Sequence, residues 1–256
     1  MRNKTKPSKS PRLTAKSFIE RLEAHSSPVE VQKSLRYFKA NENNRHDRFI
    51  GVRMGQVFAL VKEFIEMPLK EIEKLLESPI HEARAGGCSI MAKQATRKNT
   101  TPERRKELYD LYLRRHDRIN NWDLVDLASY KVVGSYLFDF EKPRTILYKL
   151  ARSKNTWERR TSIVATLYFI RKGDLADTFK IAQLLIKADQ DLVHKGMGWA
   201  LRYAGQKDRK QLLSFLDKNA ATMPRVALRY AIEHLDKKQR EKYLGMKKVE
   251  ARAAGK

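Results

Sequence analysis

Apolar residues recur along most of the chain at intervals of three and four positions, the spacing of one face of an α-helix. The alternation that is typical of strands is largely missing, and glycine (11) and proline (8) are scarce. Pro28 and Pro102 stand where a first helical turn would begin. The pattern predicts an all-α protein, with helices in the first half over residues 17–24, 27–39, 54–66, 68–77, 79–96 and 102–116.

The second half of the chain repeats. Helical segments begin near Trp122, Thr156, Asp189 and Met223, about 34 residues apart. Second helices are expected between them, over residues 143–152, 174–186 and 208–218. Helix pairs at this period cannot each bury an apolar face alone, so they are expected to stack into a curved solenoid with a concave face.

The chain is expected to hold one folded domain between two basic ends. Residues 1–16 are predicted to be a disordered arm, residues 17–246 a single helical-repeat domain and residues 247–256 a basic tail. No segment approaches the ~20 apolar residues of a membrane span, and neither end resembles a secretory signal. Cys88 stands alone, which excludes an intramolecular disulfide. We expect no membrane association and an intracellular location.

Positive charge narrows the classes of partner. Lys and Arg total 54 against 30 for Asp and Glu, a formal net charge of +24. Such an excess attracts polyanions, and DNA is the obvious one because phosphate neutralisation supplies most non-specific affinity. A basic protein without a nucleic-acid partner stays open as the alternative.

Four basic residues near predicted helix starts are followed by small residues: Arg84, Arg160, Lys195 and Arg225. Lined up in successive repeats, they would place a row of cations on one face. The other interpretation is that the small residues only allow neighbouring helices to pack closely. The repetition favours a binding face.

One short segment combines an aromatic residue with an acid. Asn121 can cap a helix, which leaves Trp122 and Asp126 four positions apart on one face and Val125 toward the core. A carboxylate should repel DNA unless it has a particular task. A capping or salt-bridging role for Asp126 is the alternative.

Two further tryptophans stand at matching places in later repeats. Trp157 begins its helix and is expected to hold that turn against the core. Trp199 follows Gly196 and Gly198, each of which costs a helix roughly 1 kcal/mol relative to alanine. Something must therefore come close to the backbone there, either a neighbouring helix or a ligand that reaches Trp199.

These segments together resemble the AlkD-like DNA alkylation repair family. The resemblance rests on Asn-Trp-Asp-Leu-Val-Asp at 121–126, Trp-Glu-Arg-Arg at 157–160 and Lys-Gly-Met-Gly-Trp-Ala-Leu-Arg at 195–202. Tyr37 and Gly-Val-Arg at 51–53 add to it, so that it covers about residues 17–245. Each motif alone is weak, but their order and spacing are specific.

The resemblance implies a C-shaped stack of HEAT-like repeats that binds double-stranded alkylated DNA along a basic concave face. It implies hydrolysis of the N-glycosidic bond of cationic purines, chiefly N3-methyladenine and N7-methylguanine, by a monomer without cofactor or metal. It further implies a lesion that stays stacked while its sugar is contacted, and it fits a bacterial cytoplasm.

By position in the motifs, Asp126 resembles the essential carboxylate, and Trp122 and Trp199 resemble the aromatic pair beside the lesion's sugar. Arg160 resembles an arginine that contacts the DNA backbone. Where many relatives have Glu after the last motif, this chain has Tyr203. The predicted DNA contacts outside this set are Tyr37, Arg84, Lys195, Arg202 and Arg225.

The chemistry fits these residues. A cationic purine is a good leaving group, so little acid catalysis is needed, and positive charge develops on the deoxyribose instead. A fixed carboxylate stabilises that charge and can position the attacking water. A non-catalytic DNA- or RNA-binding repeat protein and a scaffold for an acidic protein are the alternatives. A metal-dependent nuclease is disfavoured because no convincing ligand spacing is present.

Overall fold

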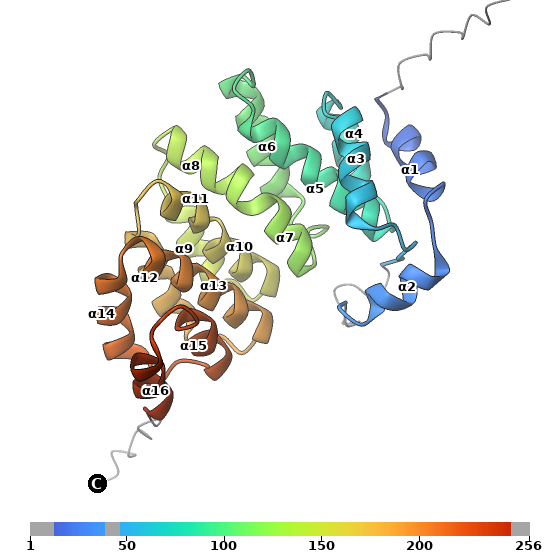
Figure 1. The fold of residues 1–256 in the computed structure, drawn as a ribbon. Helices are drawn as coiled ribbons and strands as arrows, with labels where there is room; N and C mark the ends of the chain where they lie inside the picture. The colour runs from blue at the N-terminus through green and yellow to red at the C-terminus, as the bar shows by residue number, and fades with distance from the viewer. Residues whose placement is uncertain (1–12, 39–46, 247–256) are drawn as a thin grey trace, which may run out of the picture. The chain divides into compact units, whose positions relative to one another are not determined.

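The computed structural model describes residues 13–38 and 47–246 and is all-α over them (Figure 1). Their only strand-like feature is an isolated bridge between Arg48 and Ile80. Most of the predicted basic arm and the whole of the tail at 247–256 lie outside the described residues. None of the described helices combines the length and apolar character needed to cross a membrane.

The contacts divide the chain into two compact units, with the division between Ile119 and Asn120. The single domain expected over residues 17–246 stays a prediction. Unit 1 contains six helices among its described residues: α1 Ala15–Glu23, α2 Pro28–Leu35, α3 Met54–Glu63, α4 Leu69–Glu77, α5 His81–Thr96 and α6 Pro102–Arg114.

Helices α1, α3, α4 and α6 pack against α5, which is buried along most of its length. Phe18 of α1 lies edge-on to Phe64, with ring centroids 5.2 Å apart. A side chain at Gly86 of α5 would place its Cβ 2.5 Å from the Phe18 ring. The small residues after Arg84 therefore allow close packing of helices, which was the alternative to a binding face.

Unit 2 confirms the predicted helix pairs. Its elements are α7 Trp122–Ser129, the π-helix η1 Tyr130–Gly134, α8 Ser135–Asp139, α9 Thr145–Ala151, α10 Thr156–Val164, α11 Thr166–Arg171, α12 Ala176–Leu185, α13 Asp191–Lys207, α14 Arg209–Asn219, α15 Arg225–Ala231 and α16 Lys237–Gly245. Helices α7, α10, α13 and α15 pack side by side in one layer, and α9, α12 and α14 form the second layer behind α10 and α13 (Figure 1).

Local capping explains several helix starts. The side chains of Asn121, Asn155 and Asp208 accept backbone N–H groups at the first turns of α7, α10 and α14. Thr14 caps α1 in the same way, so this helix begins at Ala15, two residues before the predicted start of the domain. Pro224 precedes α15, which begins at Arg225, two residues after Met223, near which this helix was predicted to start.

Glycine at position 198 brings α13 close to α15. A Cβ there would lie 2.5 Å from the backbone oxygen of Ala227. We expect Gly198→Ala to destabilise unit 2 by about 1–3 kcal/mol, because the backbone of α15 would have to move. All three tryptophans of the chain belong to unit 2. Thermal unfolding followed by tryptophan fluorescence therefore reports this loss directly.

Gly245→Ala is the matched control for this experiment. Nothing lies within 4 Å of a Cβ at Gly245, and alanine is the better helix former. This variant should unfold at the temperature of the unmodified protein or slightly above it. Equal unfolding temperatures for the two variants would contradict the close approach at Gly198.

Candidate active site

The first turn of α7 presents Trp122 and Asp126 on one face. The Asn121 side chain accepts the N–H of Trp122 at 2.9 Å and starts the helix there, as predicted. Val125 is fully buried, whereas Trp122 and Asp126 are only partly buried. The apolar side of the turn anchors α7, and the face with the aromatic residue and the acid stays within reach of a ligand.

Asp126 is held by an arginine from the next helix of the layer. Arg160 of α10 donates from Nε to Oδ1 of Asp126 at 3.0 Å and from Nη2 to Oδ2 at 2.7 Å. Such two-point pairing fixes the plane of a carboxylate as well as its position. The Arg160 side chain is 6% exposed and that of Asp126 is 21% exposed. The carboxylate is therefore the accessible partner of the pair.

The remaining end of the Arg160 guanidinium reaches α13. Nη1 donates to the backbone oxygen of Leu192. A Cβ at Gly196 would lie 3.2 Å from Nη1, so the missing side chain leaves room for the guanidinium. Arg160 thus joins α7, α10 and α13, and the close neighbour that Gly196 implied is a side chain from another repeat.

Trp199 follows Gly196 by three positions and shares its face of α13. Trp199 is partly buried, and its ring meets that of Tyr203 edge-on, with centroids 5.9 Å apart and planes at 87°. Tyr203 is 40% exposed. The residue that departs from the family pattern therefore extends the aromatic surface that begins at Trp199. In the sequence, the four-residue spacing of Trp199 and Tyr203 was the feature that could have predicted this contact between their rings.

The protonation of Asp126 follows from its surroundings. Removal from water raises the pKa of this carboxyl group, the charge and hydrogen bonds of Arg160 oppose that rise, and nearby Asp123 adds to it. The net direction is upward. Arg160 therefore favours the ionised carboxylate against the effect of burial.

The other predicted DNA contacts of unit 2 have partners within the protein. Lys195 pairs with Asp191 at 2.7 Å, and Arg202 pairs with Glu233 in the turn after α15. Arg225 is exposed and donates to the backbone oxygen of Leu244 at 2.8 Å. The charges of Lys195 and Arg202 are each paired with an acid, whereas Arg225 has only a backbone acceptor and keeps N–H groups that can donate to a phosphate. Their DNA contacts stay predictions.

In unit 1 the predictions for Tyr37 and Arg84 have different outcomes. Tyr37 is 73% exposed in the turn after α2, as a DNA contact requires. Arg84 has no exposed surface and pairs with Asp47. A guanidinium without accessible surface cannot contact a phosphate, so the structure is against the DNA contact predicted at Arg84. Its partner, Asp47, lies far upstream in the sequence.

The predicted row of cations also needs correction at Arg160. Its guanidinium is occupied by Asp126 and Leu192 and is almost inaccessible, which is unlike a side chain that grips the DNA backbone. The structural role predicted for Trp157 is confirmed, since that side chain is 2% exposed. Asp126, Arg160, Trp122 and Trp199 remain as the candidate set, carried by three neighbouring helices.

Comparison with known proteins identifies the family and supports the fold. The sequence model of one family, described as DNA alkylation repair enzyme, matches residues 18–235. A solved structure described as a predicted DNA alkylation repair enzyme from Enterococcus faecalis is similar in fold, with a TM-score of 0.66 and 18% sequence identity, over 83% of this chain and 98% of that one. No curated protein matches. Since the family match spans most of the sequence, the chain belongs to the family of DNA alkylation repair enzymes.

Proposed function

We propose that this protein is a DNA glycosylase that hydrolyses the N-glycosidic bond of cationic alkylated purines, with N3-methyladenine and N7-methylguanine as its substrates. The observation that carries the proposal is the accessible carboxylate of Asp126, oriented by two hydrogen bonds from buried Arg160 in a chain of net charge +24. Membership of the repair family supports the substrate class.

In the proposed reaction the bond between C1′ of the deoxyribose and the purine nitrogen breaks. Its electron pair goes to the purine, which leaves as a neutral base, and the sugar becomes an oxocarbenium ion. The negative edge of Asp126 stabilises that ion at short range. A water molecule adds to C1′ and its proton passes to Asp126 and then to solvent, which leaves an abasic site.

The ion pair with Arg160 allows a carboxylate to lie where DNA is proposed to bind. Because the ion pair is neutral as a whole, it does not repel the phosphates that approach a basic protein. The guanidinium occupies one lone pair on each oxygen of Asp126, and the outer edge of the carboxylate stays available. A fixed anion also needs no reorganisation when the sugar becomes positive.

The tryptophans supply attraction for a cation. An aromatic face attracts a positive charge by about 0.5–2 kcal/mol. We expect Trp199→Ala to lower the rate of release of N3-methyladenine between about twofold and thirtyfold. Binding to unmodified duplex DNA should change less. Leu244→Ala, which also truncates an exposed apolar side chain in unit 2, should leave release unchanged. Equal losses of release and of DNA binding would point to a role in general affinity.

The test of the function is release of free base from methylated duplex DNA without added metal. The protein should release N3-methyladenine and N7-methylguanine well above the spontaneous rate, and abasic sites should accumulate in equal amount. Tight binding to duplex DNA without release would reject the glycosylase and favour a DNA-binding module.

A further inference from the structure

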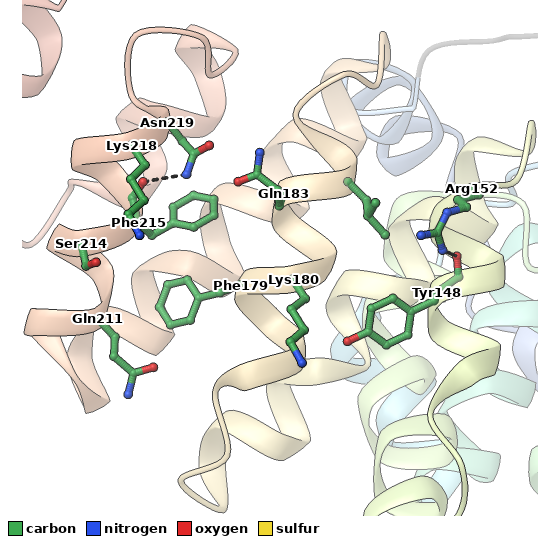
Figure 2. A pocket seen from close by; sticks show the side chains of 11 residues that line it. Tyr148, Arg152, Phe179, Lys180, Gln183, Gln211, Ser214, Phe215, Lys218 and Asn219 are labelled. Atoms are coloured by element: carbon green, nitrogen blue, oxygen red, sulfur yellow. Dashed lines mark hydrogen bonds between the residues drawn. The ribbon is translucent and has the colours of Figure 1, made fainter.

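The second layer of helices in unit 2 carries an open groove of about 540 Å³, and none of its lining residues belongs to the helices that carry Asp126, Arg160 and Trp199. It is bordered by α9, α12 and α14, and Figure 2 shows the side chains that line it. Phe179 and Phe215 form its apolar floor, with ring centroids 5.5 Å apart. Leu184 adds to this floor. The floor is of a size that accepts an aliphatic side chain.

The rim of the groove is cationic. Arg152, Lys180 and Lys218 come from the three bordering helix segments, and no described carboxylate lies within ion-pairing distance of any of them. Arg152 donates only to the backbone oxygen of Tyr148, at 3.0 Å. Nearby cations are different, since Arg144 pairs with Asp174 and Asp177. Asp177, which accepts a hydrogen bond from Tyr148 at the groove, therefore already has its negative charge paired with Arg144.

Polar groups without charge complete the lining. Gln183, Gln211 and Ser214 lie on exposed positions of α12 and α14, and the amide of Gln211 already donates to Asp208 at 2.8 Å. Asn219 likewise donates to the backbone oxygen of Phe215 at 2.8 Å (Figure 2). Gln183 and Ser214 can bond to the backbone of an extended segment. An apolar floor, a cationic rim and exposed polar side chains are together the features of a peptide-docking groove.

We propose that this groove binds an acidic peptide segment of a partner protein, with one aliphatic side chain on the Phe179–Phe215 floor and its carboxylates against Arg152, Lys180 and Lys218. Charge complementarity selects this occupant. Single-stranded nucleic acid fits less well, because Phe215 is only 9% exposed and Phe179 is partly buried, so neither ring is fully open for a base to stack on. Since the groove lies in the other layer from Asp126, a partner bound there leaves the carboxylate accessible.

The experiment uses the full chain and a fluorescein-labelled peptide with one leucine at the centre of a glutamate- and aspartate-rich sequence. Binding is followed by fluorescence anisotropy at physiological ionic strength. The double variant Lys180→Glu with Lys218→Glu should weaken binding about tenfold or more. Lys237→Glu with Lys238→Glu is the matched control on α16, and it should bind as the unmodified protein does. Ser214→Trp should also weaken binding, because it fills the groove without changing charge.

Two outcomes overturn the proposal. If the peptide with serine in place of its leucine binds equally well, or if both double variants weaken binding equally, the interaction is general attraction to a basic protein. If an unmodified single-stranded oligonucleotide displaces the peptide and loses affinity in the same groove variants, the occupant is nucleic acid. Base release by the groove variants is measured in parallel and should be unchanged, so that this result stays separate from the glycosylase test.

Discussion

Replacing Asp126 by asparagine is expected to reduce base release about a hundredfold or more while duplex DNA binding is kept or slightly improved. The amide has nearly the shape of the carboxylate but lacks the negative charge that would stabilise the developing oxocarbenium ion. Loss of the anion also leaves the positive charge of Arg160 uncompensated, which favours the approach of phosphates. Single-turnover release of N3-methyladenine and N7-methylguanine, with DNA affinity measured on the same preparations, checks both parts.

Asp123→Asn is the control for this variant, because it makes the same change in the first turn of the same helix. Its release rate should stay within about twofold of the unmodified protein, as is usual for a charge without a direct role. Asp126→Asn keeps one acceptor for Arg160, and we expect a loss of stability of about 1–3 kcal/mol. A purely structural Asp126 would instead show weakened DNA binding that follows unfolding, with release falling in proportion.

The second large effect is expected for Arg160→Lys, which keeps the charge but loses the two-point contact with Asp126 and the bond to Leu192. Arg160 lowers the pKa of Asp126 against the effect of burial, so its replacement should raise that pKa further. The reaction needs the ionised carboxylate. Activity is therefore lost as pH falls through this pKa, and the loss should begin at higher pH in the variant.

Release rates measured from mildly acidic to mildly alkaline pH separate this effect from general damage. The unmodified protein should lose activity on the acidic side at a pH above the usual range of an aspartic acid, since the pKa of Asp126 is raised. In Arg160→Lys the rate should be about tenfold lower at neutral pH and recover toward alkaline pH. A rate that is reduced by the same factor at every pH would mean that Arg160 only supports the fold.

Helices and their caps were predictable because their causes are local. The predicted start at Trp122 is correct since Asn121 can cap only the turn that follows it. The repeat of about 34 residues likewise placed α10 within the correct pair, and its tryptophan in the core. The faces of Trp122, Val125 and Asp126 follow from helical periodicity alone.

Tertiary partners were not predictable in the same way. Arg84 and Arg160 share one local pattern, a basic residue before small ones, and each ends beside a different acid that is remote in sequence. Arg84 pairs with Asp47 and is fully buried, whereas Arg160 pairs with Asp126, whose side chain is 21% exposed. The bond from Arg160 to the Leu192 backbone oxygen left no signal, because any residue type supplies that acceptor. Arg84 and Arg160 therefore look alike in the sequence but differ in their burial and in their partners.

The contacts of Arg160 with α7 and α13 limit which helix pairs this repeat protein can gain or lose. Stacked repeats are usually gained and lost as whole modules, because each interface depends only on its two neighbours. Here the guanidinium spans three successive helices of one layer, α7, α10 and α13. Removing one module could preserve the stacking and still separate Asp126 from Arg160. The proposed site therefore depends on one fixed order of modules, whereas the stacking of the helices does not.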